Sequence, residues 1–448
     1  MIFTVGYPGS TQRLKTVAQL EYLRDLQYKN QYYLYDTFFK DLTMLQKKYP
    51  DKFDSMEAIK TRLGNTQKVY VGRMNGLNDE KLMQRKKDFE QKLIDAVNAD
   101  PEMKKDYSHL WKAIKSLQDE LRKIRPQIDI MTPRNFFIPV YFTVADSLLF
   151  LAEQLNMPAA ERADLFNDDA EIRKAMIEIF PTDFDTVIEN ARLKIMADYI
   201  IMNLGENNEL VKKMFGGKKG WEAADYALSK SKIEDKEALQ KFALSKPEEI
   251  FNSDDPFILF ALMKKNELLE LQERQTEIDN TEEVYENLLG QALFSVYSTS
   301  FPPDANATIR ISDGTLMGFE YNGTIAPVKT TYYGMYDRYY SYEGEYPFNL
   351  PEVWQNPPAD FNMAAEYNFV STNDIVGGNS GSAVINRNAE AIGVAFDGNI
   401  VSNVGNIIFV PSDNRCVSVS TQGMMEAFEH IYKVDRLAKE LKTGKIVK

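Results

Sequence analysis

The sequence predicts an α+β protein in which a large helical domain precedes a mainly β domain. Two observations carry this prediction. Residues 11–297 form long amphipathic stretches with apolar residues near helical spacing, interrupted by proline-containing breaks. Beyond Phe301, Pro302 and Pro303, short β-prone runs alternate with turns rich in Gly, Asn and Asp. We therefore expect a short strand within residues 1–10, a helical domain over residues 11–297 and a mainly β domain over residues 298–448.

Composition limits the class of protein. The chain has 448 residues, enough for two or more domains, and its 44% hydrophobic and 27% charged residues favour ordered structure over disorder. No apolar run is long enough for a membrane-spanning helix. The net charge of −13 argues against a nucleic-acid-binding protein, because no overall positive field attracts phosphates. Cys416 is the only cysteine, so neither an intrachain disulfide nor a multi-cysteine zinc site can form.

The first ten residues are predicted to form a strand that runs into a turn at Pro8 and Gly9. They lack the basic segment and the long apolar segment of a signal peptide. Because the chain begins within a predicted strand, we expect that a segment upstream of Met1 is missing.

Several elements are specific enough to predict. Residues 79–97 and 256–275 are rich in Glu, Lys, Leu and Gln, which favours packed helices. In the β region, one hairpin is expected to turn at Asp313 and Gly314, between residues 308–311 and 316–321. A second hairpin should join residues 383–385 to 391–396, and residues 421–443 should form a closing helix.

Ser380 is the main candidate for chemistry. It lies in the run Gly378, Asn379, Ser380, Gly381 and Ser382, which follows a polar turn and precedes a strand-like run. Small neighbours let a substrate carbonyl approach a nucleophilic hydroxyl, and the N–H groups of Gly378 and Ser380 could hold an oxyanion. The alternative is an ordinary turn, since Gly, Asn and Ser are common turn formers.

Asp397 is the second candidate. It follows Ser380 by 17 residues, so the return strand of a hairpin could bring the two side by side. A carboxylate there could bind the ammonium group of a substrate. The alternative is that Asp397 and Gly398 only form a turn.

The two histidines, His109 and His430, are both expected in helical segments. Neither has the turn and carboxylate context that a catalytic base needs, so each is interpreted as a structural or surface residue. With two histidines and one cysteine, a transition-metal catalytic site is not expected.

Several blocks of sequence, taken together and in order, resemble a known family. They cover nearly the whole chain: residues 5–13 (VGYPGSTQR), 16–22 (TVAQLEY), 99–101 (ADP) with Trp111, 302–305 (PPDA), 318–324 (GFEYNGT), 330–334 (TTYYG), 369–374 (FVSTND), 377–382 (GGNSGS) and 396–399 (FDGN). The resemblance is to the bacterial dipeptidyl-peptidases of the seven and eleven type. These are serine exopeptidases of the chymotrypsin clan, with a double β-barrel and a large inserted helical domain. The resemblance implies that residues 1–10 are a residual strand of the first β-barrel and that residues 298–448 form the second, chymotrypsin-like β-barrel domain.

The resemblance implies a role for each matching residue. Ser380 would be the nucleophile, with the N–H groups of Gly378 and Ser380 as oxyanion donors, and Asp397 would bind the free amino end of the peptide. Asn65, in residues 63–68 (LGNTQK), would be a second contact to that amine. Gly398 stands where relatives selective for acidic side chains carry an arginine, which favours an apolar residue before the cut. No metal or organic cofactor is implied.

Two departures from the family pattern limit what carries over. Ala383 stands where many relatives have proline, which should leave the nucleophile intact. The family's catalytic His and Asp lie upstream of residues 5–13, so we expect residues 1–448 alone to have little peptidase activity. The alternative is a truncated, catalytically silent homologue or a peptide-binding fragment. Full-length relatives are periplasmic or on the cell surface, and a homodimer is left open.

Overall fold

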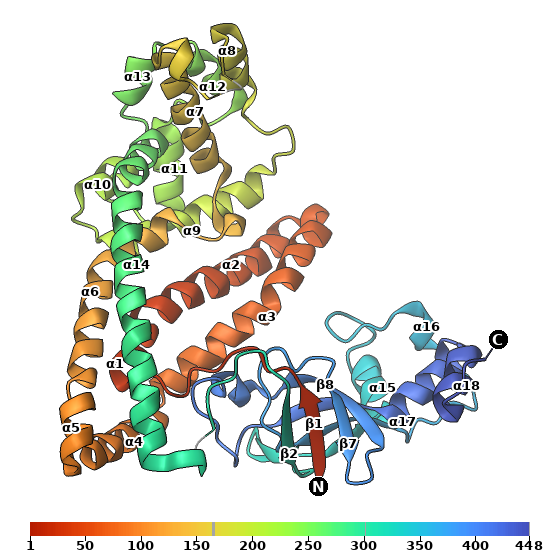
Figure 1. The fold of residues 1–448 in the computed structure, drawn as a ribbon. Coiled ribbons are helices and arrows are strands. Elements are labelled where there is room, and N and C mark those ends of the chain that lie inside the picture. The colour runs from red at the N-terminus through yellow and green to blue at the C-terminus, as the bar shows by residue number, and fades with distance from the viewer. Residues whose placement is uncertain (164–165, 301, 448) are drawn as a thin grey trace. The chain divides into compact units, whose positions relative to one another are not determined.

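The computed structural model describes residues 1–163, 166–300 and 302–447, and the chain divides into two units. The sheet unit consists of Met1–Lys15, Asn75–Gln84 and Tyr297–Lys448, and the helical unit consists of Thr16–Met74 and Arg85–Val296 (Figure 1). The domain boundaries predicted from the sequence lie between residues 10 and 11 and between residues 297 and 298. In the structure, residues 11–15 and 75–84 also belong to the sheet unit. Phe301, named in the predicted break, lies outside the described residues.

The helical unit follows the predicted pattern. Residues 79–97 fall almost wholly in α4, and residues 256–275 begin the long helix α14. Its helices are α1 (Val17–Tyr22), α2 (Tyr28–Lys48), α3 (Phe53–Asn78), α4 (Glu80–Ala99), α5 (Pro101–Tyr107), α6 (Leu110–Met131), α7 (Val140–Asn156), α8 (Asp169–Glu178), α9 (Thr186–Leu204), α10 (Glu209–Phe215), α11 (Gly220–Lys230), α12 (Lys236–Ala243), α13 (Pro247–Phe251) and α14 (Pro256–Tyr297). The division between the units falls within three helices: residues 75–78 of α3, residues 80–84 of α4 and Tyr297 at the end of α14 are assigned to the sheet unit.

Caps and aromatic packing explain why these helices begin and associate as they do. Thr16 and Gln19 form a capping box at α1, and the side chains of Asp185 and Asn208 accept hydrogen bonds from the first N–H groups of α9 and α10. In the core, the fully buried ring of Phe257 stacks on Tyr141 at 5.2 Å. One large apolar cluster, which runs from α2 through α7 and α9 to α14, holds much of the unit together.

The sheet unit is built on a seven-stranded antiparallel sheet in the order β2-β1-β7-β8-β9-β6-β5. Its strands are β1 (Ile2–Gly6), β2 (Arg310–Gly314), β5 (Lys329–Thr331), β6 (Glu366–Ser371), β7 (Ala383–Asn386), β8 (Ala391–Gly398) and β9 (Cys416–Ser420), and a separate hairpin pairs β3 (Phe319–Tyr321) with β4 (Thr324–Ala326). The N-terminal strand β1 lies between β2 and β7, so it shares one sheet with the strand that follows Ser380 (Figure 1).

Of the two predicted hairpins, one is confirmed and one is wrong. β7 and β8 pair as an antiparallel hairpin across the turn at residues 387–390. Asp313 and Gly314, however, lie inside β2 and pair with Phe3 and Ile2 of β1. The turn in this region is instead at Asn322 and Gly323, whose φ angles of 49° and 75° match the mirror-image turn that Asn-Gly favours.

The predicted closing helix is present but divided. It consists of α17 (Thr421–Glu426), a π-helical turn at Ala427–Ile431 and α18 (Asp435–Thr443), with Lys433 at φ 52° in the break. This end packs with α15 (Tyr332–Ser341) and α16 (Glu352–Gln355) through buried aromatic residues that include Tyr332, Tyr336 and Phe361. Over the described residues, no helix is both long and apolar enough to span a membrane.

Candidate functional site

Ser380 lies in a tight turn between β6 and β7, and its side chain is exposed. Glycines with positive φ stand on both sides of it, Gly378 at 105° and Gly381 at 88°. A Cβ at Gly378 would come within 2.4 Å of the carbonyl oxygen of Tyr7, so this position also has no room for a side chain. The run of small residues therefore shapes the turn and leaves the Ser380 hydroxyl open to approach.

The backbone of this turn is partly hydrogen-bonded. The N–H of Asn379 donates to Val376 at 3.1 Å, and that of Gly381 donates to Ala395 at 2.8 Å. By contrast, the N–H groups of Gly378 and Ser380 donate to no group in the described part of the chain. The Ser380 hydroxyl makes one long contact, 3.5 Å to the carbonyl oxygen of Phe396. Two backbone donors and one hydroxyl are thus available in a three-residue span.

Asp397 follows directly after Phe396 in β8. Its side chain is exposed, and one carboxylate oxygen accepts the N–H of Gly398 at 2.8 Å. The register of β8 against β9 shifts between Ala395 and Asp397, an irregularity of the kind that redirects side chains. Asp397 is therefore one residue from the carbonyl that the Ser380 hydroxyl contacts.

Gly398 lies where neighbouring atoms leave no space for a side chain. A Cβ there would lie 2.1 Å from Oγ of Ser402, which stands in the short 3-10 helix Ile400–Val404. Ser402 Oγ itself donates to the carbonyl oxygen of Asn399 at 2.7 Å. A larger residue at 398 would therefore require the segment that follows to move.

The histidines differ from expectation in one respect. His430 does have carboxylate neighbours, with Nδ1 3.5 Å from Asp360 and Nε2 3.5 Å from Glu426, so the expected lack of such a context is wrong for this residue. It lies in the π-helical turn, where its ring packs against Phe361. The hydrogen bond found for the Ser380 hydroxyl goes to Phe396 and not to His430.

The remaining sequence candidates are placed as follows. His109 is exposed at the start of α6 in the helical unit, edge-to-face with Tyr285. Asn65 is exposed on α3, also in the helical unit, and its contact with a peptide amine stays a prediction. Cys416 is fully buried in β9, and burial raises the pKa of its thiol, which disfavours thiolate chemistry there.

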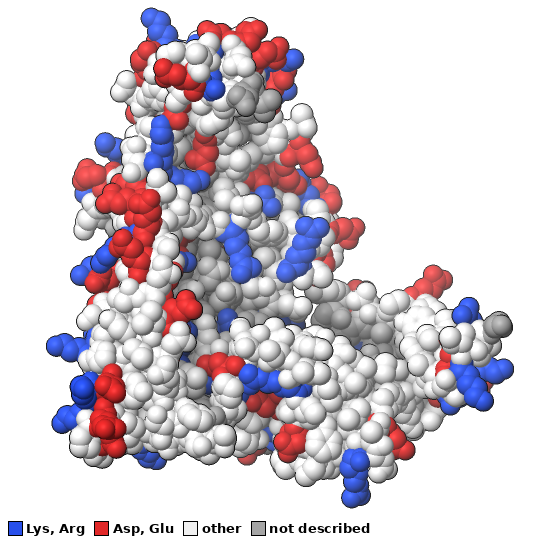
Figure 2. Space-filling model, in the orientation of Figure 1, with Lys and Arg blue, Asp and Glu red and all other residues white. Residues whose placement is uncertain are grey.

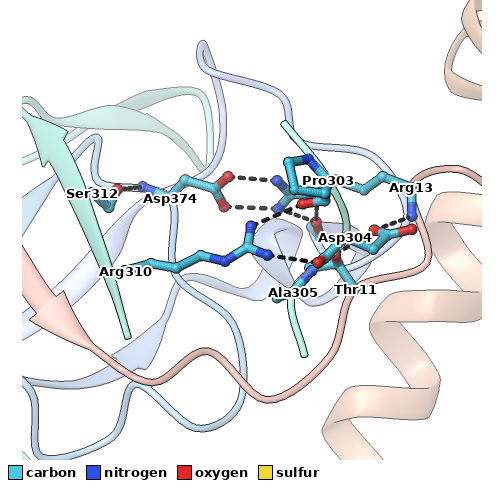
Figure 3. Close-up of polar contacts among 9 residues, drawn as sticks. Thr11, Arg13, Pro303, Asp304, Ala305, Arg310, Ser312 and Asp374 are labelled. Atoms are coloured by element: carbon cyan, nitrogen blue, oxygen red, sulfur yellow. Dashed lines mark hydrogen bonds and ion pairs between the residues drawn. The ribbon is translucent and has the colours of Figure 1, made fainter. Parts of the chain in front are cut away.

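A polar network beside the Ser380 turn was not expected from the sequence. Arg13 makes a bidentate ion pair with Asp374, which lies six residues before Ser380. Its Nη1 and Nη2 are 2.5 and 2.8 Å from the two carboxylate oxygens (Figure 3). Asp304 accepts the N–H groups of Arg13 and Leu14 and the hydroxyl of Thr11. The one signal for it was that Arg13, Asp374 and Asp304 all lie in blocks that carry the family resemblance.

The charge distribution adds no further candidate. On the face shown in Figure 2, acidic and basic side chains are interspersed over the helices. In the part of the chain that the structure describes, no group of three or more His, Cys, Asp or Glu side chains is placed to hold a metal ion.

Comparisons with known proteins agree on one family. The family model described as Peptidase S46 matches residues 1–443. A protein named Dipeptidyl-peptidase 7 from Porphyromonas endodontalis is 24% identical over 458 residues, covering 98% of this chain and 54% of its own length. One named Asp/Glu-specific dipeptidyl-peptidase, from Shewanella putrefaciens, is 21% identical over 494 residues, covering 98% of this chain and 64% of its own. The chain thus spans about half to two thirds of the length of these relatives.

Solved structures show the same likeness. The crystal structure of Porphyromonas endodontalis DPP11 matches with a TM-score of 0.76 at 16% identity, covering 98% of this chain and 64% of that one. Its complex with the dipeptide Arg-Glu matches with a TM-score of 0.73 at 17% identity and the same coverage. At these identities the match establishes the fold, a helical domain together with an antiparallel sheet.

Proposed function

Because the chain belongs to the peptidase S46 family, whose model matches residues 1–443, we propose that its sheet unit carries the acyl-transfer site of a serine dipeptidyl-peptidase. Ser380 is the proposed nucleophile. The observation that carries this proposal is the turn itself, with an exposed hydroxyl between two positive-φ glycines and two backbone donors that have no acceptor in the described part of the chain. The fold class and the family fit this proposal.

The proposed reaction passes through an acyl-enzyme. The Ser380 oxygen attacks the carbonyl carbon of the second peptide bond, and the negative charge that develops on the carbonyl oxygen is stabilised by the N–H groups of Gly378 and Ser380. Donors fixed in the folded turn need no reorganisation as charge develops. The amine leaves with a proton, and water then releases the dipeptide from Ser380.

Asp397 explains why dipeptides, in particular, would be released. An exposed carboxylate that accepts only one intramolecular hydrogen bond in the described part of the chain, from Gly398, can also pair with the ammonium group of a free N-terminus. Anchoring that ammonium at a fixed distance from Ser380 selects the second peptide bond. Asn65 of the helical unit is proposed as a second partner for the amine.

The side chain before the cut is proposed to be apolar. Gly398 offers no charge to an acidic side chain, and Ser402 fills the space in which a side chain at 398 would begin. An acidic residue would then be desolvated without a partner. This favours the specificity of the relatives named Dipeptidyl-peptidase 7 over that of the relatives named Asp/Glu-specific dipeptidyl-peptidase.

In the described part of the chain, the Ser380 hydroxyl is hydrogen-bonded to no side chain that could act as its base. His430 is engaged with Asp360 and Glu426, and the Ser380 hydroxyl contacts a carbonyl oxygen. A serine without a base keeps its proton, and loss of a triad member lowers kcat by about four to six orders of magnitude. Residues 1–448 alone are therefore proposed to hydrolyse peptides only weakly. The alternative function is that of a silent homologue that binds peptides through the same site.

The test is an assay of fluorogenic dipeptidyl amides, with Ser380→Ala and, as a matched control, Ser341→Ala at the exposed end of α15. Any hydrolysis should disappear in Ser380→Ala and persist in Ser341→Ala, and Leu should be preferred to Asp or Glu before the cut. Hydrolysis that survives Ser380→Ala would overturn the assignment, whereas robust Ser380-dependent activity would show that a base is present.

Both the enzyme and the silent homologue are expected to bind peptides, so binding tests the role of Asp397 and the hydrolysis assay separates the two functions. Calorimetric titration with a free-amine tetrapeptide should give measurable affinity, which N-acetylation of the peptide or Asp397→Asn should reduce, because either change removes one charge of the pair. Equal affinity for free and acetylated peptides would remove Asp397 from the site. A homodimer and export to the periplasm or cell surface are further proposals, testable by sedimentation and by cell fractionation.

A further inference from the structure

Arg13 makes contact with two loops that both lead to the proposed site. It stands between β1 and α1, within the sheet unit. Its Nη1 and Nη2 donate to the two carboxylate oxygens of Asp374, and its Nε and Nη2 donate to the carbonyl oxygen of Gly405 at 2.9 and 2.6 Å. The guanidinium also lies over the ring of Phe409, 5.6 Å from its centre. Only the planar fork of an arginine can make this set of bonds, because an ammonium group is a single point of charge.

The first loop runs from Asp374 to Ser380. The N–H of Asp374 donates to Oγ of Ser312 on β2 at 2.8 Å, so its backbone is fixed to the sheet while its side chain holds Arg13 (Figure 3). Farther along, the carbonyl of Gly377 accepts the N–H of Gly9 at 2.7 Å. Arg13 and Gly9 thus hold the Ser380 turn from the same N-terminal segment.

The second loop follows Asp397. Gly405 ends the short helix that contains Ser402, the residue packed over Gly398. Beside it, the carbonyl of Asn406 accepts the N–H of Gln12 at 2.6 Å. The guanidinium of Arg13 therefore ties the segment after Asp397 to the segment before Ser380.

The backbone of the N-terminal segment is held separately from the guanidinium. Asp304 accepts the N–H of Arg13 at 2.9 Å and that of Leu14 at 3.2 Å. A change confined to the Arg13 side chain consequently leaves the backbone of this segment attached. It removes the bonds of the guanidinium to Asp374 and Gly405. This separation makes the role of the side chain testable.

We propose that Arg13 is a positioning residue that fixes the Ser380 turn through Asp374 and the segment after Asp397 through Gly405. The significance of this role rests on the proposed function of Ser380 and Asp397. Its test does not use activity, so a failure of the inference and a failure of the proposed function are told apart.

The test is hydrogen exchange by mass spectrometry on the full chain and on Arg13→Lys, which keeps the charge and loses the fork. The hydrogen-bonded N–H groups within residues 374–381 and 399–407 should exchange about tenfold faster, since loss of a hydrogen bond to a charged group shifts a local equilibrium by about that factor. Exchange in the β7–β8 turn, residues 386–390, should not change. Asp374→Asn should reproduce the effect over 374–381, and the double variant should be no worse there than either single variant.

Arg310→Lys is the matched control. Arg310 belongs to the same network, but its hydrogen bonds in the described part of the chain go to the carbonyl oxygens of Pro303 and Asp304, at 2.8 and 2.6 Å, and not to Asp374 (Figure 3). It should leave residues 374–381 unchanged. The inference is overturned if Arg13→Lys leaves both loops unchanged, if Arg310→Lys loosens the Ser380 turn equally, or if Arg13→Lys raises exchange evenly across the sheet unit or unfolds it, because Arg13 would then be a general support.

Discussion

Each of the two units is stabilised internally by a different kind of interaction. The helical unit has a large apolar core in which residues such as Phe257, Leu148 and Phe38 are fully buried. The sheet unit has smaller apolar clusters, and its loops contain buried polar residues, among them Asn373, Asn379, Asn399 and Arg415, each less than a tenth exposed.

This difference matches what each region needs. Apolar burial is strong but non-directional, so it stabilises a domain without fixing any one atom closely. Hydrogen bonds between buried groups fix distances and angles, and they cost stability when one partner is lost. We infer that the loops of the sheet unit depend on specific polar partners, whereas the helical unit depends on packed volume.

The largest effect is expected in the helical core. Phe257→Ala removes a ring that stacks on Tyr141 and meets Phe142 edge-on at 5.3 Å. It should lower the free energy of unfolding by about 3–5 kcal/mol, the usual cost of deleting a buried aromatic ring. Phe294→Ala, at a position 62% exposed, is the control and should change it by less than about 0.5 kcal/mol.

Tryptophan fluorescence can assign that loss to one unit. Of the three tryptophans, Trp111 and Trp221 lie in the helical unit and Trp354 lies in the sheet unit. In a Trp354→Phe background, the denaturant midpoint of Phe257→Ala should fall clearly. A fall of the same size for Phe294→Ala would contradict the view that packed volume holds this unit together.

The second effect tests the polar side of the comparison. Arg415 is 3% exposed, and its guanidinium donates to the carbonyl oxygens of Met317, Gly318, Pro411, Ser412 and Asn414. Arg415→Met keeps the length of the side chain but leaves these acceptors unsatisfied, which should cost about 2–4 kcal/mol. Trp354 fluorescence in a Trp111→Phe, Trp221→Phe background should report the loss. Arg436→Met on exposed α18 is the control, and equal stability of both variants would refute the polar interpretation.

A third variant separates geometry from stability. Gly378→Ala places a Cβ against the Tyr7 carbonyl at φ 105°, which should cost about 1–3 kcal/mol of backbone strain. The expected consequence is a displaced turn, seen as faster exchange over residues 374–381, with the rest of the sheet unit unchanged. Gly377→Ala, where a Cβ meets nothing within 4 Å, is the matched control. Unchanged exchange in Gly378→Ala would show that the turn does not require glycine there.

Local sequence patterns predicted those elements whose structure depends on residues close together in the chain. The helices and the β7–β8 hairpin follow from periodicity and turn residues, and the turn at Ser380 follows from its run of small residues. Asn322 and Gly323 form a mirror-image turn of the kind expected at Asp313 and Gly314. Those two residues were drawn into a strand because β1, more than 300 positions away in sequence, pairs with them.

The contacts that hold the Ser380 turn in place could not be predicted from the sequence, because they too join residues far apart in the chain. Arg13 and Asp374 are 361 positions apart, and no local pattern links an arginine in one segment to an aspartate in another. The two carboxylates beside His430 show both cases: Glu426 lies four positions before it and is readable from helical spacing, whereas Asp360 approaches from a distant loop. A single sequence thus suggests candidate residues for chemistry more readily than it suggests the long-range contacts of the loops that bear them.

The smallest expected effect comes from a polar group at a helix end in the helical unit. Asp185 caps α9 by accepting the N–H groups of Val187 and Ile188 at 3.0 and 3.3 Å, and it pairs with Lys52 at 2.6 Å. Burial alone would raise the pKa of Asp185, but the hydrogen bonds from Lys52 and from these N–H groups hold it below its ordinary value. Asp185→Ala should cost about 1 kcal/mol at pH 7, the usual value of an N-cap.

The pH dependence of that cost has a defined sign. Because the pKa of Asp185 is lower in the folded state, its stabilising effect is present above the unfolded-state value of about 4 and is lost as the pH falls through the folded-state value. The difference between the parent and Asp185→Ala should therefore shrink between pH 7 and pH 3. Asn208 caps α10 through the N–H groups of Leu210 and Val211 with a neutral amide, so Asn208→Ala should cost a similar amount at both pH values. Urea titrations of the three proteins at pH 7 and pH 3 measure this, and an Asp185→Ala difference that stays constant with pH would show that the charge of Asp185 adds nothing to its role as a cap.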